Sequence, residues 1–525
     1  MSRGPVNQLD TAGESPLRLA ELVGSLSLVT DLGMGQPLEH TLRTCLLAVR
    51  LGEAAGLDHD EVSTAYYVAL LRWIGCTADA HEAAGLFGDE IESRAAFALI
   101  DPASPAQMLR FMRRHVGAGS STPRRARLLV GALAAGKEGP RQAFRAHCEV
   151  AQRLAARLGL PEPVQRALGD VFERWDGNGF PAGARGSAIV PPARLVVLAR
   201  DVEVFHRAGG ADAALALVRE RSAGAYDPEI CRCFLDSGER LFERLAEEPP
   251  WEATLAAEPE PALAVADLDG ACRAIADFAD LKSPYTVGHS HGVAELAEAA
   301  SWRLGLPRPE VVCVRRAALL HDLGRVGVSN QVWDKPGPLT PSEWERVRTH
   351  PYLTERVLSY SPALAPLARL AGMHHERLDG SGYHRGVSAP ELDLAARVIA
   401  AADVYQALGE DRPHRPRFDA ARAADELRKE VESGRLDAGA ANAVLEAAGH
   451  RGSPAAPPRP AGLTDREVEV LRELARGKSN KEAGLALGIS HKTVGHHVQH
   501  IYEKLGVSTR AGATLFAAEH GLARD

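Results

Sequence analysis

Apolar residues recur along almost the whole chain at a spacing close to 3.6 residues, separated mainly by alanine, arginine and glutamate. The segments 38–57 and 311–324 are two examples. This spacing places the apolar side chains on one face of a helix. Aromatic residues make up only 5% of the chain, and no alternating β-branched run occurs that would favour a strand. The sequence therefore predicts an all-α protein.

Two parts of the chain repeat each other. The stretch HTLRTCLLAVRLGEAAGL, which begins at His40, aligns without a gap with HSHGVAELAEAASWRLGL, which begins at His289. Farther on, FERWDGNGFPAG aligns with HERLDGSGYHRG and places Glu173 on Glu376. Two stretches that each keep their register favour an internal duplication over chance. We therefore expect two related helical domains.

Two proline-rich segments divide the chain. Residues 246–263 combine proline with alanine and glutamate, and residues 450–462 combine it with glycine. Such composition favours extended chain that buries no core. Residues 1–15 are expected to be an unstructured lead-in. The expected domains are a helical domain over 16–245, a second helical domain over 264–449 and a small four-helix domain over 463–525.

The composition excludes some classes of protein. Asp and Glu outnumber Lys and Arg by 69 to 61, so the chain as a whole is not a basic nucleic-acid coat protein, although one small domain can still bind DNA. The seven cysteines are scattered and odd in number, which is typical of reduced thiols. No apolar run reaches the roughly 18 residues of a membrane span, and the N-terminus has no apolar signal segment. We expect a soluble, cytoplasmic protein.

Residues 280–416 concentrate histidine and aspartate in ordered motifs. Imidazole and carboxylate ligands suit a divalent transition metal such as Mn, Fe, Ni or Zn. No cysteine takes part, which argues against a structural zinc site. A single buried histidine is usually an ordinary core residue, but seven residues in ordered motifs favour a metal site. The candidate ligands are His289, His321, Asp322, His350, His374, His375 and Asp403.

The sequence around these residues resembles the HD superfamily of metal-dependent phosphohydrolases, and within it the HD-GYP branch, known for cyclic di-GMP phosphodiesterases. The resemblance implies two metal ions held by the seven candidates, with Asp322 as the catalytic residue that bridges both. Two such ions would lower the pKa of a bridging water and stabilise charge on phosphoryl oxygens. The matching segments are SPYTVGHS (283–290), ALLHDLGRVGVSNQVWDKPGPLT (318–340), THPYL (349–353), HHERLDGSGYHRG (374–386) and RVIAAADVYQALGEDRPHR (397–415).

Several positions depart from the family's pattern. Arg325 stands in place of the family's lysine, and the resemblance implies that it contacts substrate phosphate as a second catalytic residue. Tyr285 replaces a glutamate that binds a third metal in some members, so we expect two metals. Gly292 replaces an arginine and His384 a proline, which leaves the preference for cyclic di-GMP open. Further candidates for phosphate contacts, with a solvated basic loop as the alternative, are Arg412 and Arg415.

The first repeat has lost most of the candidate ligands. It keeps His40, His147 and, with a one-residue gap, Asp201, but Arg72–Trp73 stand at the His–Asp pair and Val171–Phe172 at the paired histidines. The loss of four of seven ligands should abolish a two-metal site. We expect Trp73 and Phe172 to fill the space, the remaining histidines to be structural, and this domain to be a non-catalytic partner or sensor.

The C-terminal segment predicts a helix–turn–helix domain. Thr464 and Glu467 form a capping box before the first helix, a second helix follows Ser479, Ser490 caps a third, and a short helix follows Ser508. The sequence resembles the LuxR-type (GerE-like) DNA-binding domain over its whole length, through LTDREVEVL, GKSNKE, ISHKTVGHH and KLGVSTR. The resemblance implies that the third helix enters the major groove of double-stranded promoter DNA.

The resemblance also implies which residues of this domain contact DNA. Gly495 replaces a basic residue, and Gly484 interrupts the second helix at a cost of about 1 kcal/mol relative to alanine. We therefore expect modest, salt-sensitive affinity that depends on a homodimer. The residues expected to face DNA from the third helix are Lys492, Thr493, Val494 and His497. Those expected to contact phosphates are Lys478, Asn480, Lys481, Lys504 and Arg510.

Three hypotheses remain for the whole chain. The first is a LuxR-family transcriptional regulator whose second helical domain binds or hydrolyses a cyclic dinucleotide or other phosphoester and thereby controls DNA binding. The alternative is primarily a metal-dependent phosphodiesterase, with the helix–turn–helix as a targeting or dimerisation module. A third is a regulator whose metal ligands are only scaffolding. Domain order favours the first. Because residues 1–462 carry a net charge of −9 that would repel DNA, we expect the 450–462 linker to let the DNA-binding domain stand clear of them.

Overall fold

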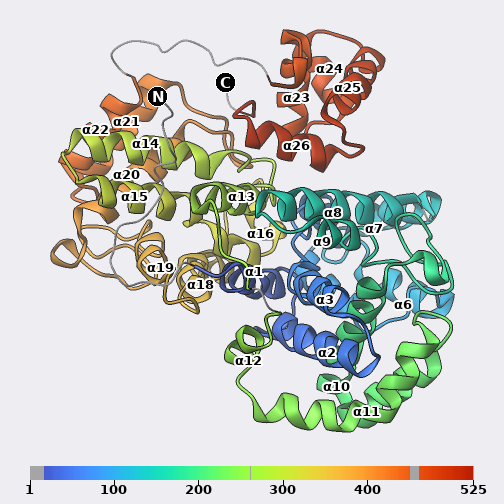
Figure 1. The fold of residues 1–525 in the computed structure, drawn as a ribbon. Coiled ribbons are helices and arrows are strands. Elements are labelled where there is room, and N and C mark those ends of the chain that lie inside the picture. Colours follow the sequence, from blue (N-terminus) through green and yellow to red (C-terminus); the bar gives the residue numbers. More distant parts are fainter. Residues whose placement is uncertain (1–16, 137, 260–261, 450–459, 524–525) are drawn as a thin grey trace, which may run out of the picture.

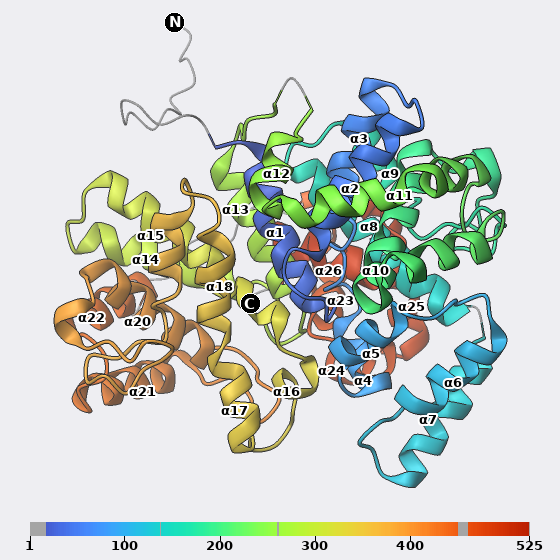
Figure 2. The same cartoon turned by 90° about the horizontal axis from the view of Figure 1, so that it is seen from below.

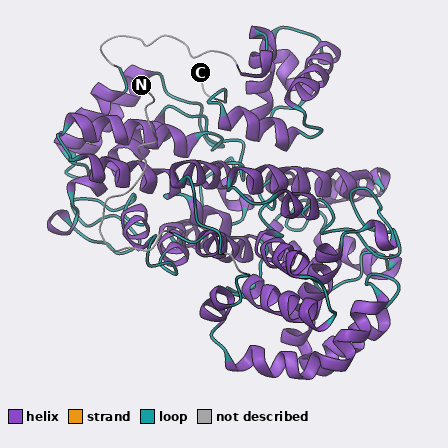
Figure 3. Cartoon of the chain, viewed as in Figure 1, coloured by secondary structure: helices purple, strands orange, loops and turns teal. Residues whose placement is uncertain are grey.

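Helices form all the regular secondary structure of the residues that the structure describes. The computed structural model of the chain describes residues 17–136, 138–259, 262–449 and 460–523 (Figure 1). No strand occurs within these ranges (Figure 3), so the all-α prediction is confirmed. The expected lead-in 1–15 and most of the expected linker 450–462 lie outside the described residues.

The N-terminal half runs from α1 to α11. Its longest helix, α10, is broken by non-helical backbone at Gly209 and Gly210. The elements are α1 (Leu19–Gly33), α2 (His40–Ala54), α3 (His59–Leu71), α4 (Ala80–Phe87), α5 (Glu90–Phe97), α6 (Pro105–His115), α7 (Thr122–Ala135), α8 (Glu138–Arg157), α9 (Glu162–Ala167), η1 (Gly186–Ala188), α10 (Pro191–Arg221) and α11 (Pro228–Glu247).

The C-terminal half and the small terminal module follow, joined to the N-terminal half by one short helix, α12 (Pro250–Ala256). The half contains α13 (Leu268–Asp280), α14 (His289–Arg303), α15 (Arg308–Leu320), η2 (Leu323–Gly327), α16 (Asn330–Trp333), α17 (Pro341–Arg348), α18 (His350–Leu358), α19 (Ala365–Ala371), η3 (Ala389–Glu391), α20 (Leu394–Leu408), α21 (Ala420–Glu432) and α22 (Ala438–Ala447). The module contains η4 (Pro460–Gly462), α23 (Asp465–Ala475), α24 (Asn480–Leu487), α25 (His491–Leu505) and α26 (Arg510–Glu519).

The two halves use the same local devices at equivalent positions. The buried carboxylate of Asp31 accepts hydrogen bonds from the backbone nitrogen (3.1 Å) and hydroxyl (2.5 Å) of Thr41, at the start of α2. Asp280 accepts the same two bonds from Ser290, at 2.8 and 2.7 Å, at the start of α14. Burial raises the pKa of both carboxyl groups to about 7. This match in structure supports the duplication inferred from the sequence.

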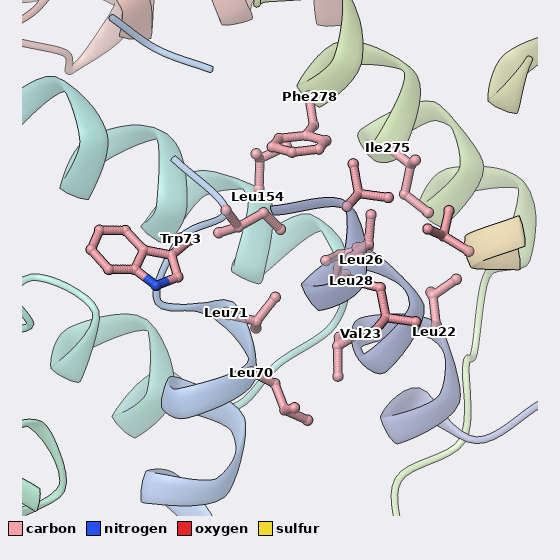
Figure 4. Close-up of a cluster of buried hydrophobic side chains, with 14 of the residues drawn as sticks. Leu22, Val23, Leu26, Leu28, Leu70, Leu71, Trp73, Leu154, Ile275 and Phe278 are labelled. Carbon is pink, nitrogen blue, oxygen red and sulfur yellow. The ribbon is translucent and has the colours of Figure 1, made fainter. Parts of the chain in front are cut away.

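A single hydrophobic core runs through both halves. Figure 4 shows Leu22 and Leu26 of α1 beside Ile275 and Phe278 of α13. A Cβ added at Gly33, the last residue of α1, would lie 2.7 Å from the side chain of Val326, so the helix end packs directly on the C-terminal half. The boundary between the two expected helical domains is therefore a packed apolar interface, in which burial is favourable on both sides.

A buried ion pair also crosses this interface. The carboxylate of Glu90, at the start of α5, lies 3.0 Å from the ammonium nitrogen of Lys282. Glu90 also accepts hydrogen bonds from the hydroxyl of Ser329 (2.5 Å) and the backbone nitrogen of Asn330 (2.9 Å). Glu90 is fully buried and Lys282 is 3% exposed. Each charge therefore depends on the other half of the molecule for its compensation.

The expectation that residues 246–263 form extended chain without a core is wrong for α12. Trp251 is buried, and its ring lies 5.2 Å from that of Tyr360 between centroids. A Cβ added at Gly24 in α1 would touch the same indole at 3.0 Å. The carbonyl oxygen of Thr254 accepts a hydrogen bond from Tyr66 at 3.0 Å. Composition averaged over the segment did not reveal that Trp251 is buried.

The terminal module docks on the rest of the protein, which contradicts the expectation that it stands clear. It lies over α8 and α13 in Figure 1, and the view of Figure 2 shows α23 and α26 behind the N-terminal half. Leu515 of α26 is fully buried in the core that the two halves share. The apolar contact of Leu515, a hydrogen bond to Glu149 and the ion pairs of Glu519 with Arg153 and Arg157 hold the module at this surface.

Two further expectations concern the chain as a whole. All seven cysteines are free, and five of them are buried. None of the helices in the described ranges is both long enough and apolar enough to cross a membrane.

Candidate metal centre

All seven predicted metal ligands lie together in the C-terminal half, each at or near a helix end except Asp403, which is within α20. Six of them fall into two groups, within each of which the ligand atoms lie within 4.8 Å of one another: His289, His321 and Asp322 in one, and His350, His374 and His375 in the other. His289 and His350 begin α14 and α18, and the His321–Asp322 pair follows α15. The fold therefore brings motifs that are separate in the sequence together at one site.

Asp322, a member of the first group, also reaches the second. Its Oδ2 is 3.7 Å from Nε2 of His289 and 3.5 Å from Nε2 of His321. Its Oδ1 is 3.3 Å from Nε2 of His350 and 3.6 Å from Nε2 of His374. One carboxylate thus presents one oxygen to each group, which is the arrangement that a ligand bridging two ions requires.

Asp403 also reaches both groups. Its Oδ1 is 3.2 Å from Nε2 of His289, and its Oδ2 is 3.7 Å from Nδ1 of His375. The two carboxylates and five imidazoles leave a cluster of converging lone pairs with little solvent exposure. Such a hard, nitrogen- and oxygen-based donor set suits divalent transition metals.

Hydrogen bonds to the main chain orient three of the imidazoles. Because each Nδ1 donates its hydrogen to a carbonyl oxygen, Nε2 carries the lone pair and faces the centre. The Nε2 atom of His321 is buried and has no hydrogen-bond partner among the described residues, so the residues present fit a metal ion there. The Nδ1 bonds run from His321 to Ala318 (2.7 Å), from His350 to Val347 (2.6 Å) and from His374 to Ala371 (2.7 Å).

The electrostatics of the centre keep two of the predicted ligands, His321 and Asp322, in the forms that bind metals. Burial lowers the pKa of His321 to about 4, so this imidazole is neutral near pH 7. Burial alone would raise the pKa of Asp322, but Arg325 and His321 outweigh it and hold that pKa well below its usual range. The neutral imidazole and ionised carboxylate need no proton release to bind a cation.

Sequence reasoning missed Glu410, which lies in the loop after α20. Its Oε2 is 2.9 Å from Nδ1 of His289, opposite the nitrogen that faces the centre. Gln406 and Arg412 bind the same carboxylate, each at 2.8 Å. Glu410 is contained in the segment 397–415 that carries the family resemblance, but no spacing rule singles it out as a partner of a histidine 121 residues earlier.

We expect Glu410→Gln to weaken metal binding by about 10- to 100-fold, because partners that orient a ligating histidine contribute on this scale. The variant keeps the shape of the side chain but removes the charge that polarises His289. Titration of the metal-free full chain with Mn²⁺ would measure the affinity. Glu446→Gln, an exposed position on α22, makes the same charge change away from the centre and should bind Mn²⁺ like the wild type.

Of the three arginines predicted to contact phosphate, only Arg325 lies at the centre. Its Nη1 is 3.0 Å from Oδ2 of Asp322, and its guanidinium stacks 3.9 Å from the ring centroid of Trp333, a second residue that the sequence did not single out. Arg412 pairs with Glu410 instead. The guanidinium of Arg415 donates to main-chain carbonyl oxygens, the shortest bond being 2.7 Å to Ala407, and so orders its own loop.

The structure shows what surrounds two of the residues that depart from the family pattern, Gly292 and His384. A Cβ added at Gly292 would lie 2.3 Å from the side-chain amide of Gln406, so that amide occupies the space next to the helix. Nε2 of His384 lies 3.4 Å from a carboxylate oxygen of Glu355.

The equivalent region of the N-terminal half is filled as the sequence predicts. Trp73 and Phe172 lie 5.6 Å apart between ring centroids, and His147 packs edge-on against Phe172 at 4.8 Å. His147 bonds through Nε2 to the carbonyl oxygen of Arg72 at 2.8 Å, and His40 pairs with Glu203. Both retained histidines are thus committed to contacts within the protein.

The terminal module has the predicted helix–turn–helix order and caps. The capping box of Thr464 with Glu467 is present, and Ser490 caps α25. Gly484 does not interrupt α24; a Cβ there would lie 2.7 Å from the carbonyl oxygen of Ile489, so the close approach of the backbone requires glycine. The prediction that Val494 faces DNA is wrong, because its side chain is fully buried in the module's own core.

The other residues predicted to bind DNA differ in their exposure and in whether their side chains already have partners within the module. Three phosphate candidates have partners within the module: Lys478 pairs with Glu473, Lys504 with Glu467 at 2.7 Å, and Arg510 donates to the carbonyl oxygen of Leu474 at 2.9 Å. His497 is partly exposed. The exposed candidates are Asn480, Lys481, Lys492 and Thr493.

Comparisons with known proteins agree with this architecture. A profile of the HD domain family matches residues 133–230 and 273–439, once in each half, and a profile of bacterial regulatory proteins of the luxR family matches residues 461–517. Over 419 residues the chain is 31% identical to "3'3'-cGAMP-specific phosphodiesterase 3" of Vibrio cholerae, covering 77% of this chain and 89% of that protein.

Two other relatives are similar. A cyclic di-GMP phosphodiesterase of Pseudomonas aeruginosa is 37% identical over 167 residues, which cover 31% of this chain and 40% of that protein. The crystal structure of a cyclic GMP-AMP-specific phosphodiesterase of V. cholerae superposes with a TM-score of 0.57 at 27% identity, covering 83% of this chain and 99% of that one. The chain therefore belongs to the HD domain family, whose domain it carries in two copies, followed by a C-terminal domain of the luxR family.

Proposed function

We propose that the C-terminal half hydrolyses a 3'3'-linked cyclic dinucleotide with two divalent transition-metal ions, and that the state of this half controls DNA binding by the terminal module. The observation that carries the enzymatic part is the position of Asp322, with one oxygen toward each ligand group. Bound at these groups, two ions would supply an activated water and neutralise charge on the phosphate. The relatives named for 3'3'-cGAMP and cyclic di-GMP indicate the substrate class.

The protein's own residues would position the substrate. Arg325 is cationic, held at the centre by Asp322 and Trp333, and able to bind phosphate through two nitrogens. Tyr383 lies against His375, with ring centroids 4.7 Å apart, and presents an aromatic surface at the same place. The full chain should be incubated with Mn²⁺ or Fe²⁺ and, in separate reactions, 3'3'-cGAMP and cyclic di-GMP. Linear product is expected; intact substrate in every reaction would refute the enzymatic part.

The regulatory part rests on how α26 docks. Glu149 of α8 accepts a hydrogen bond from the hydroxyl of Thr509 at 2.7 Å, just before α26. At the other end of that helix, Glu519 lies 2.9 Å from Arg153 and 3.2 Å from Arg157. The main contacts of α25, the predicted recognition helix, are with η4, α23, α24 and α26 of the module itself. The rest of the protein thus contacts the module mainly through α26, whereas α25 packs mainly against the module's own helices.

The docking surface is connected to the metal centre. Arg157 also lies 2.7 Å from the buried carboxylate of Asp277, and Asp277 lies 2.9 Å from Nε2 of His291, two residues after the ligand His289 on α14. The loop that leads into α14 touches the module as well, since a Cβ added at Gly477 would lie 2.8 Å from Pro284. A shift of α14 on binding substrate would therefore reach the module through rigid contacts.

Loosening the docking should strengthen DNA binding, because the docked module lies against a body of net charge −9 that repels DNA. We expect Glu519→Gln, which removes the partner of Arg153 and Arg157, to raise affinity for mixed-sequence double-stranded DNA about 5- to 100-fold. Gel shifts at fixed salt would measure it. Glu469→Gln, at a partly exposed position on α23 where Glu469 pairs with Arg466, makes the same charge change at a residue whose ion-pair partner is within the module.

Two outcomes separate the hypotheses. Adding Lys492→Ala and His497→Ala to Glu519→Gln should remove the gain, because these residues lie on the outward face of α25. Equal DNA affinity of Glu519→Gln, Glu469→Gln and the wild type would favour the alternative, in which the chain is primarily a phosphodiesterase and the module only targets or dimerises it.

A further inference from the structure

Three guanidinium groups lie in the N-terminal half, in the region equivalent to the candidate metal centre of the C-terminal half. Arg72 stands at the position of His321 and Asp201 at that of Asp403. Arg200 pairs with Asp201, and Arg221 lies 3.6 Å from the same carboxylate. Among the described residues, no other acidic side chain forms an ion pair with any of the three. Three positive charges therefore share a single negative one.

The single carboxylate is already fully used. Besides Arg200 and Arg221, Asp201 accepts a hydrogen bond from the hydroxyl of Tyr226 at 2.6 Å. Arg72 is 5% exposed, and burial together with the neighbouring Arg200 lowers its pKa to about 9. The cluster thus keeps an excess of positive charge where water does not compensate it.

Several N–H groups of the cluster are buried without an acceptor. Within the described ranges, Nε and Nη1 of Arg72 and Nε of both Arg200 and Arg221 are shielded from solvent and have no hydrogen-bond partner. Buried polar groups are normally paired, so four unpaired donors around one cluster call for a missing acceptor. The side chains of Arg200 and Asp201 retain 13% and 12% exposure, so one edge of the cluster borders solvent.

We propose that this cluster binds a phosphoryl group, so that the N-terminal half recognises a phosphate-bearing ligand without cleaving it. Guanidinium groups bind phosphate oxygens through two parallel N–H bonds, and a phosphate would supply both the missing charge and the missing acceptors. The rings of Trp73 and Phe172, each 5.0 Å from the guanidinium of Arg72, hold that group in place. The phosphoryl group can belong to a cyclic dinucleotide or to free phosphate.

Calorimetric titration of the full-length chain tests the site with two probes. Inorganic phosphate is titrated into the wild type, and 3'3'-cGAMP into Asp322→Ala, which should leave the dinucleotide intact. Each titration is repeated with Arg72→Gln added. We expect Arg72→Gln to weaken binding of one or both probes at least tenfold, with loss for 3'3'-cGAMP indicating a nucleotide ligand and loss for phosphate alone indicating free phosphate. Arg72→Lys, which keeps the charge, should lose less.

Controls keep the result interpretable. Arg174→Gln makes the same charge change in the same half, but Arg174 has two acidic partners, Asp101 and Asp176, each at 3.0 Å. It should bind both probes like its parent chain. If Arg72→Gln does not fold, Arg200→Gln is held to the same criterion. Equal binding with and without the substitution overturns the proposal and leaves Arg72 as a replacement for the metal's charge. Hydrolysis by the C-terminal half is measured separately, so failure of that activity is distinguishable.

Discussion

Replacing Asp322 by alanine is expected to reduce the hydrolysis of cyclic dinucleotides by roughly a thousandfold or more. Removal of a single group that stabilises a transition state already costs about 10²–10³ in rate. Here the residue lost is the one carboxylate that faces both ligand groups, with its two oxygens 3.5 Å from His321 and 3.3 Å from His350. Chromatography of the products formed in Mn²⁺ would give the rate.

The fold should survive this substitution. Asp322 is paired with Arg325, whose side chain is 16% exposed and stacked on Trp333, so the guanidinium can turn toward water when its partner is removed. Circular dichroism and the melting temperature would check this. Asp425→Ala, at an exposed position of α21, should have the wild-type rate. A wild-type rate for Asp322→Ala as well would exclude its role in the centre.

The largest expected effect on stability comes from Glu90. Replacing it by glutamine should lower the free energy of unfolding by about 3–5 kcal/mol, because Lys282 would remain buried with no opposite charge. The interface between the halves would also lose its acceptor for Ser329 and Asn330. Urea denaturation followed by tryptophan fluorescence would measure the change. Glu162→Gln, which breaks a solvent-exposed pair with Arg166, should cost much less than Glu90→Gln.

A double-mutant cycle measures how strongly Glu90 and Lys282 stabilise each other. Replacing Glu90 and Lys282 together by Gln and Met removes both buried charges, so the double variant should be less destabilised than Glu90→Gln alone. Additive losses would show that the pair does not couple the halves. Neither substitution touches the metal centre, so metal content per folded chain should stay at the wild-type level.

The structure brings together the metal ligands that the sequence singled out, because the motifs that identify them are local. The pairs His321–Asp322 and His374–His375 are adjacent in the chain, and each lies at a helix end whose position follows from apolar spacing. The side chain that orients His289 was beyond reach, since Glu410 is 121 residues away and becomes a partner only when α14 and α20 pack together.

In the terminal module, too, the sequence predicted the local features and missed the contacts between distant residues. Its caps at Thr464 and Ser490 were predictable, because a capping residue and its acceptor are three positions apart. The rotation of α25 about its own axis was not predictable, and the side chain of Val494 faces the core of the module. The docking was also missed, because net charge says nothing of specific pairs such as Arg157 with Glu519, which are 362 residues apart.

The metal content of the purified full-length chain decides whether the C-terminal half holds the proposed two-metal centre. Elemental analysis after dialysis against metal-free buffer should find about two transition-metal ions per chain, as expected for a two-metal centre. The same measurement on Asp322→Ala should find fewer, with Asp425→Ala unchanged. A wild-type chain that holds no metal after purification, and binds none when Mn²⁺ or Fe²⁺ is supplied, would contradict the proposed centre and the hydrolysis attributed to it.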